Sequence, residues 1–171
     1  MIVLTVPHSE CRLTDVRDCD RAAMRFASAL HRAIPESVVL PSHYYRPEMD
    51  ANRIASRKTP YREKLRQALD HADMLLDIHS FPAIPGVWGD DVPPDTPLVV
   101  LSMDETLGYK LALNRRLARL NFTVILQGSM ENDIAVEAWQ RHRCPSVLLE
   151  INESLDSDTI KQIAKMISRL I

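Results

Sequence analysis

Short apolar runs alternate along the chain with longer segments in which apolar residues recur every three or four positions. The short runs are typical of buried strands, and the longer segments are typical of amphipathic helices. The expected strands cover residues 2–6, 37–40, 74–82, 98–101, 122–126 and 146–151. The expected helices cover residues 21–34, 60–72, 105–120, 131–141 and 157–171. This order predicts an α/β fold: a single domain of residues 1–171 with a mainly parallel, mixed sheet and helices on both faces.

Two long segments lack an apolar period. The first, residues 42–59, is dense in charged and tyrosine side chains, and the second, residues 83–96, is rich in proline and contains Trp88. Long loops in compact domains are usually functional or disordered. The polar and aromatic content of residues 42–59 favours a functional loop.

Three of the expected strands carry polar side chains at or near their ends. His8 follows the first strand, His79 lies in the stretch MLLDIHSFP, and Glu150 lies near the end of the last strand. The carboxyl ends of parallel strands meet at one edge of the sheet, where ligands bind. Two histidines and a carboxylate are the ligand set of a catalytic zinc, and a further carboxylate could accept a proton from water. The alternative for His79 is a core histidine hydrogen-bonded to Asp77.

The loop motif Asp-Ala-Asn-Arg at residues 50–53 is a second candidate for chemistry. An arginine fork matches a carboxylate at two points, so Arg53 could bind an anionic substrate. Asn52 could add a hydrogen bond to the same group, and Asp50 could orient Arg53. The alternative is an ordinary Asp–Arg pair within a loop.

Composition narrows the function classes. The 171 residues are 46% apolar and 26% charged, and the net charge of -2 lacks the basic excess of a nucleic-acid-binding protein. No apolar run is long enough to span a membrane, and the first residues do not resemble a signal peptide, so we expect neither nucleic acid nor membrane as a partner. Three cysteines are typical of a reducing compartment, which predicts a cytoplasmic protein. Cys11 and Cys19 are close enough to pair, but two small semi-buried thiols are the preferred interpretation.

Four short motifs occur in an order that resembles a known family. They are VPHS at residues 6–9, DANR at 50–53, DIHS at 77–80 and LLEIN at 148–152. Together they resemble the N-formylglutamate amidohydrolase family, which is similar in fold to zinc carboxypeptidases and the aspartoacylase group. CDRAA at residues 19–23 also resembles the Asp-x-x-Ala helix start of that family.

The resemblance implies a phosphorylase/hydrolase-like α/β fold, one zinc ion and hydrolysis of an amide beside a free carboxylate. Carried over by position, the resemblance implies that His8 and His79 are zinc ligands and that Glu150 is the general base and later the general acid. Asn52 and Arg53 would hold the substrate carboxylate, and Arg57 and Ser80 would make further contacts with the substrate. Arg62 would be another cation near a substrate anion.

The chain departs from the family pattern around the third zinc ligand. Related carboxypeptidases have a glutamate three residues after the first histidine, where this chain has Cys11, and Glu10 replaces the glycine of the usual PHSG. Asp20, which fits the aspartate of the family's helix start, is the first choice. Glu10 and a Cys11 thiolate are the alternatives.

Three hypotheses follow for the function. The first is a zinc-dependent amidohydrolase that acts on a small anionic amide, an N-formyl or N-acyl amino acid such as N-formylglutamate. The second is a zinc carboxypeptidase-like enzyme or a cell-wall peptide amidase, which an open groove near Trp88 would favour. The third is a metal- or ligand-binding domain without turnover.

Overall fold

The computed structural model describes residues 1–11, 19–86, 92–102, 108, 112, 123–126 and 133–171. Most of the helix expected over residues 105–120 lies outside the described residues, and so does Trp88. All other expected helices and strands are present, with bounds that differ from the predicted ones by a few residues.

Six strands form one mixed sheet, as the sequence pattern predicts. The strands are β1 (Ile2–Val6), β2 (Val38–Pro41), β3 (Met74–Phe81), β4 (Leu98–Ser102), β5 (Thr123–Leu126) and β6 (Ser146–Asn152), in the order β2-β1-β3-β6-β4-β5. β2, β1, β3 and β6 are parallel to one another, whereas β4 pairs antiparallel to β6 and parallel to β5. The carboxyl ends of four neighbouring strands therefore lie at the same edge of the sheet.

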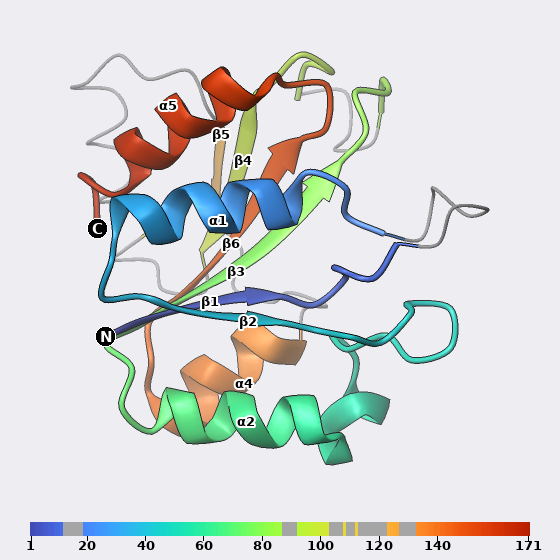
Figure 1. Ribbon diagram of the computed structural model, residues 1–171, viewed down its shortest axis with the longest axis vertical. Helices are drawn as coiled ribbons and strands as arrows, with labels where there is room; N and C mark the ends of the chain where they lie inside the picture. Colours follow the sequence, from blue (N-terminus) through green and yellow to red (C-terminus); the bar gives the residue numbers. More distant parts are fainter. Residues whose placement is uncertain (12–18, 87–91, 103–107, 109–111, 113–122, 127–132) are drawn as a thin grey trace.

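Helices cover both faces of the sheet, as Figure 1 shows. α1 (Ala23–Ala33) and α5 (Ser157–Ile167) lie side by side on one face, and α2 (Pro60–Leu69) and α4 (Asp133–His142) lie on the other. Each pair of helices buries its apolar side against the strands, around Phe26 and Ile163 on the first face and around Leu65 and Ile134 on the second. Within the described residues, no helix has the length and apolar character needed to cross a lipid bilayer.

Two helices, α2 and α5, begin at side chains that accept backbone N–H groups. The Asp156 carboxylate accepts from the N–H groups of Asp158 and Thr159, 3.0 and 2.8 Å away, at the start of α5. Thr59 accepts from the N–H of Arg62 at the start of α2, where Pro60 occupies the first helical position. Both caps satisfy N–H groups that lack a partner within the helix.

A buried ionic network joins α2 to α4. The fully buried Arg62 guanidinium donates to Asp133, 2.9 Å away, to Glu137 and to the backbone oxygen of Ala51. Burial by itself raises the pKa of Glu137, but hydrogen bonds from Arg62 and Arg66 outweigh that effect and hold the pKa below its usual range. The network also holds the loop of residues 50–53, because Arg62 donates to the backbone oxygen of Ala51 in that loop.

Candidate metal centre

Three neighbouring strands bring polar side chains to one edge of the sheet. His8 lies two residues beyond β1, and His79 lies inside β3 rather than in the loop that follows it. Glu150 on β6 is the register partner of His79 on β3. The rigid, buried strands therefore set the positions of the two histidines and of the glutamate.

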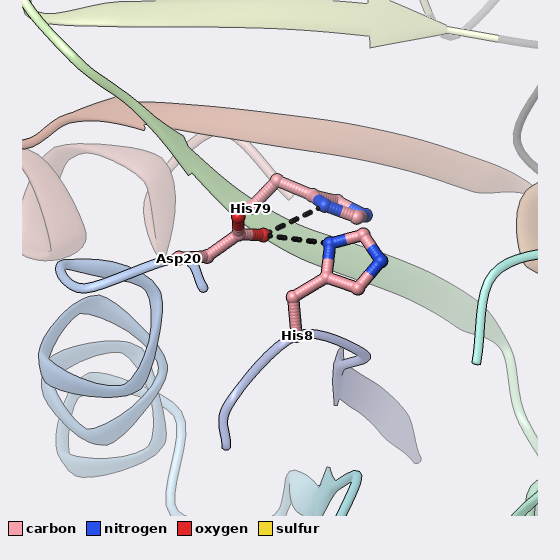
Figure 2. A group of neighbouring side chains, drawn as sticks. All are labelled: His8, Asp20 and His79. Atoms are coloured by element: carbon pink, nitrogen blue, oxygen red, sulfur yellow. Dashed lines mark hydrogen bonds and ion pairs between the residues drawn. The ribbon is translucent and has the colours of Figure 1, made fainter. Parts of the chain in front are cut away.

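The two imidazoles converge on one carboxylate, that of Asp20, just before α1 (Figure 2). Asp20 Oδ2 lies 2.9 Å from Nδ1 of His79 and 3.2 Å from Nδ1 of His8. The two rings meet edge to face with centroids 4.9 Å apart. All three residues are buried. They are the one group of three or more histidine, cysteine or acidic residues with metal-binding geometry in the part of the chain that the structure describes.

This arrangement fits a zinc ion. The donor set is two imidazole nitrogens and one carboxylate oxygen, which together with an open fourth position is the pattern of a catalytic zinc site. Bonds of about 2.0–2.1 Å in tetrahedral geometry put ligand atoms roughly 3.4 Å apart. The three donor atoms of His8, Asp20 and His79 already lie within 4.8 Å of one another. Small movements would bring them to the distances that zinc requires.

The opposite nitrogen of each ring faces a second carboxylate. Nε2 of His8 lies 2.8 Å from Asp50 Oδ1, and Nε2 of His79 lies 3.3 Å from Asp77 Oδ2. Metal-binding histidines usually donate their other N–H to such an acceptor, which fixes the ring and its tautomer. The interpretation of His79 as a histidine hydrogen-bonded to Asp77 is therefore compatible with a metal site. The contact of Asp50 with His8 was not predicted, because the loop motif pairs Asp50 only with the nearby Arg53.

The electrostatics of the cluster favour a cation. Burial lowers the pKa of His79, but Asp77 and Asp20 outweigh it and raise the pKa well above its usual value. The pKa of His8 is also raised, because Asp20 and Asp50 outweigh burial. Burial alone would raise the pKa of Asp20, yet hydrogen bonds from both histidines hold it far below its usual range. The surrounding carboxylates thus stabilise positive charge at this position, and a divalent ion would replace the protons on the imidazoles.

Glu150 lies beside the cluster, and the pKa of its carboxyl group is shifted in the opposite direction from that of Asp20. Burial raises the pKa of Glu150 to about 7, with the charges of Asp20 and Asp77 acting in the same direction and His79 opposing them. A carboxyl group with a pKa near neutrality can both accept and return a proton, as general acid–base catalysis requires. No hydrogen bond or ion pair connects the Glu150 carboxyl to another described residue.

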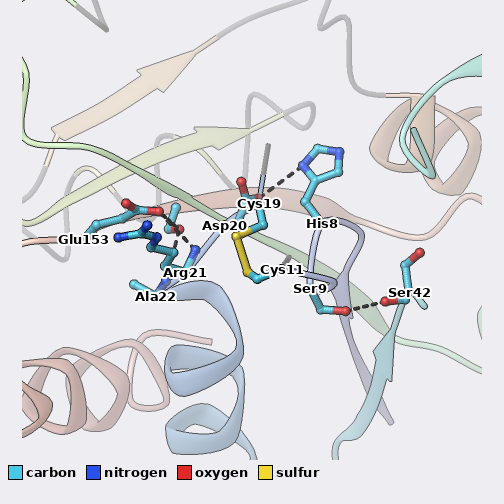
Figure 3. The surroundings of a disulfide bond; sticks show 10 residues. His8, Ser9, Cys11, Cys19, Asp20, Arg21, Ala22, Ser42 and Glu153 are labelled. Carbon is cyan, nitrogen blue, oxygen red and sulfur yellow. Dashed lines mark hydrogen bonds and ion pairs between the residues drawn. A yellow bond between two sulfur atoms is a disulfide. The ribbon is translucent and has the colours of Figure 1, made fainter. Parts of the chain in front are cut away.

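Asp20 belongs to the buried cluster with both histidines, and the two alternative ligands do not. Glu10 is exposed and lies outside the group of buried donors. The prediction that Cys11 and Cys19 remain separate thiols is wrong, because they form a disulfide (Figure 3). A disulfide sulfur is not a thiolate, so Cys11 is excluded as a ligand in this state. The cysteine pattern no longer argues for a reducing compartment, and the cytoplasmic location stays a prediction.

Asn52 is buried between the cluster of His8, Asp20 and His79 and helix α4. Its backbone N–H donates to Asp50 over 2.9 Å, and its side-chain oxygen accepts from the N–H of Ile134 over 3.1 Å. That contact turns the Nδ2 group toward His79 Nε2 and Asp77 Oδ2, 3.1 and 3.4 Å away. The amide that the resemblance assigns to the substrate carboxylate therefore has internal partners, and its Nδ2 group donates to Asp77, the carboxylate that faces His79 Nε2.

The predicted substrate-binding arginines have different surroundings. Half of the Arg53 side chain is exposed, and its Nε lies 3.4 Å from Asp50, so it lies at the rim of the cluster. Arg57 instead directs Nε and Nη2 at the Asp133 carboxylate, with 2.9 Å between Nε and Oδ2. Arg46, which the sequence analysis did not single out, lies 3.6 Å from Asp50 and adds a second cation at the same rim.

Two other predicted contacts lie away from the cluster. Ser80 follows His79 in β3 and so points to the other face of the sheet, where its hydroxyl contacts the N–H of Ala22 and the carboxylate of Glu153. Arg62 is fully buried in the network with α4. The structure therefore brings His8, His79, Asp20 and Glu150 together, with Arg53 at the rim, and places Ser80 and Arg62 elsewhere.

Known structures share this fold. A gene product of Agrobacterium tumefaciens superposes with a TM-score of 0.77 at 12% identity, covering 99% of this chain and 86% of that one. An N-formylglutamate amidohydrolase from Ralstonia eutropha gives a TM-score of 0.63 at 16% identity, covering 99% and 90%. The CwlD amidase from Clostridioides difficile, solved with the GerS lipoprotein, gives 0.58 at 15% identity, covering 98% and 93%.

No protein-family sequence model and no curated protein sequence matches the chain. The similarity therefore lies in the three-dimensional structure, and it establishes an α/β fold that an N-formylglutamate amidohydrolase and an amidase also have. The expected fold class is confirmed at this level.

Removing either imidazole tests the metal centre. We expect His8→Ala and His79→Ala each to lose stoichiometric zinc, because two donors cannot hold the ion as three do. Inductively coupled plasma mass spectrometry on protein equilibrated with zinc measures the content. His71→Ala is a matched control, since His71 is exposed and precedes β3, at the opposite end of that strand from His79. Equal zinc content in all three variants would contradict this site.

Proposed function

We propose that this chain is a zinc-dependent amidohydrolase that cleaves the amide of an N-formyl or N-acyl amino acid. The observation that carries the proposal is the cluster of His8, Asp20 and His79 with Glu150 on the neighbouring strand. The hydrolase-type fold, which an N-formylglutamate amidohydrolase and an amidase share, supports the same reaction class.

His8, Asp20 and His79 are the residues that would hold the ion. A bound zinc supplies Lewis acidity, which polarises an amide carbonyl and makes a water molecule easier to deprotonate. Asp50 and Asp77 keep the two imidazoles oriented through their outer nitrogens. The buried position of the cluster restricts bulk water, which strengthens each of these interactions.

Glu150 has the role of proton carrier. Its carboxylate accepts a proton from the attacking water and returns that proton to the leaving amine, so that one residue serves both half-steps. A pKa of about 7 makes both transfers accessible near neutral pH.

The substrate carboxylate has its best partner at the rim of the cluster. Arg53 presents a half-exposed guanidinium beside Asp50, and the Nε of Arg46 lies 3.6 Å from the same carboxylate oxygen. Two cations at one rim favour an anionic substrate. Arg57 contributes to the positive potential but directs its own fork at Asp133.

A cell-wall peptide amidase is the second candidate function. Two observations favour it: the structural likeness to the CwlD amidase, and the Cys11–Cys19 disulfide, a bond typical of oxidising compartments. Small N-acyl amino acids and peptidoglycan fragments differ in size, so one screen separates the two substrates.

The experiment begins with zinc-loaded protein and two panels of compounds. One panel holds N-formyl and N-acyl derivatives of acidic and neutral amino acids, and the other holds muropeptides. Release of free amine is followed with an amine-reactive dye. Turnover on the first panel that disappears in a Glu150→Gln variant supports the proposal. Turnover on muropeptides alone supports the second candidate, and metal binding without turnover on either supports a binding domain.

The rate should depend on pH through Glu150. Its carboxyl must be deprotonated to accept a proton, so kcat/KM should fall as the pH drops through the pKa of this group. The metal-free value is about 7, and the charge of a bound ion moves the midpoint lower. A pH–rate profile between pH 5 and 9 measures this limb. A rate that rises steadily toward pH 5 would contradict the assignment.

A further inference from the structure

The disulfide lies between two of the candidate metal ligands. Cys11 comes three residues after His8, and Cys19 comes directly before Asp20. The backbone N–H of Asp20 also donates to the backbone oxygen of His8 over 3.1 Å. Figure 3 shows the sulfur bridge next to both donor residues. The covalent bond thus connects the segment that carries one ligand to the segment that carries another.

Each segment is held to a different part of the sheet. The Ser9 hydroxyl donates to the backbone oxygen of Ser42, just beyond β2. On the other side, the backbone N–H of Arg21 donates to Glu153 over 3.0 Å, just beyond β6. The two segments are joined to each other by the disulfide, by the Asp20–His8 backbone hydrogen bond and by the contact between the His8 and Asp20 side chains.

We infer that the Cys11–Cys19 disulfide is a positioning element for the metal centre, and that its reduction weakens metal binding. This inference rests on the metal site of the proposed function. With the disulfide intact, the Asp20 carboxylate is presented to both imidazoles before the ion arrives. Without it, metal binding must also fix the position of Asp20 relative to His8.

The reduction itself is an ordinary thiol–disulfide exchange. A dithiol reductant supplies two electrons and two protons, the S–S bond breaks, Cys11 and Cys19 become thiols, and the reductant becomes its own disulfide. Cys11 is exposed, whereas Cys19 is buried, so attack at the sulfur of Cys11 is the accessible route.

Loop-closure entropy sets the size of the effect. For a loop of this length the constraint corresponds to at most ~100-fold in an equilibrium constant. The hydrogen bonds from Ser9, Arg21 and Asp20 still hold the two segments when the disulfide is reduced. We therefore expect zinc affinity to fall by between about 10-fold and ~100-fold.

The test compares zinc dissociation constants measured by competition with a chromogenic chelator. Oxidised wild type is compared with Cys11→Ser/Cys19→Ser, which cannot form the bridge. A Cys11→Ser variant controls for a free Cys19 thiol, and Cys144→Ser is the matched control because Cys144 is buried and unbridged. We expect weaker binding in both Cys11 variants and none of this loss in Cys144→Ser. Equal affinity in oxidised wild type and the double variant would overturn the inference.

A second measurement uses only the wild type, so it tests the inference even if the double variant does not fold. By linkage, an ion that binds the bridged form more tightly must also stabilise the bridge against reduction. In glutathione redox buffers, saturating zinc should make the midpoint potential of wild type more negative by about 30 mV for each 10-fold difference in affinity. An unchanged or less negative midpoint would overturn the inference. Tight, bridge-dependent zinc binding without amide hydrolysis would overturn the proposed function alone.

Discussion

Glu150→Gln should lower kcat/KM by on the order of 10²- to 10⁴-fold on any substrate that the wild type hydrolyses. The amide of glutamine has nearly the shape of the carboxyl group but cannot accept a proton at neutral pH. The zinc content should stay at one ion per chain, because Glu150 is not among the three clustered donors. Steady-state kinetics and metal analysis on the same preparation separate the two effects.

Glu153→Gln is the matched control for this variant. Glu153 also lies at the end of β6, but its carboxylate contacts Arg21 and Ser80 on the other side of the sheet. We expect its kcat/KM to stay within a few-fold of wild type. Full activity in the Glu150→Gln variant would contradict the role of Glu150 as proton carrier, whether or not the metal site is confirmed.

Arg62→Met should produce the largest loss of stability. Arg62 is fully buried and donates to Asp133 and to Glu137, so its removal leaves two buried carboxylates short of a cation. Removing one partner from a buried ion pair typically costs about 3–5 kcal/mol in the free energy of unfolding. Urea denaturation followed by circular dichroism gives this free energy and shows through the m-value whether the native state stays compact.

Arg66→Met is the control, because it removes an arginine from the same glutamate at a more exposed position. Nε of Arg66 lies 2.9 Å from Glu137 and about a quarter of its side chain is exposed. We expect a loss of about 1 kcal/mol, as for hydrogen bonds at partly exposed sites. A double variant that also carries Glu137→Leu should recover part of the stability lost with Arg62. Equal losses for the two arginine variants would contradict a dominant role for the buried network.

Most of the fold was predictable because its signals are local. The run from Ile2 to Val6 and the helical face of Phe26 and Leu30 each specify an element through apolar spacing alone. The direction of β4 was not predictable in this way. A strand's apolar pattern reads the same in both directions, so the antiparallel pairing of β4 with β6 depends on the connecting segments.

The candidate site was predictable only in part. His8, His79 and Glu150 stand at strand ends, and the topology brings such ends together. The contact of Asp50 with His8 joins residues 42 positions apart, and no local pattern encodes it. The burial of Arg62 was missed for the same reason, since its partners lie on α4, more than 70 residues away. The pairing of Cys11 with Cys19 was considered but not preferred, because two nearby cysteines are compatible with either state.

The antiparallel direction of β4 determines where the connection from β3 to β4 begins and ends. β3 ends at the edge of the sheet that carries the cluster, and β4 begins at that same edge because it runs opposite to β6. The Asn152 side chain there donates to the backbone oxygens of Pro94 and Thr96 and holds the end of this connection. Phe81 and Leu98 therefore lie at the same edge of the sheet, so the connection from β3 to β4 begins and ends there. Insertions in this connection, in nature or in the laboratory, can add chain at the edge of the sheet that carries the cluster while every strand keeps its neighbours.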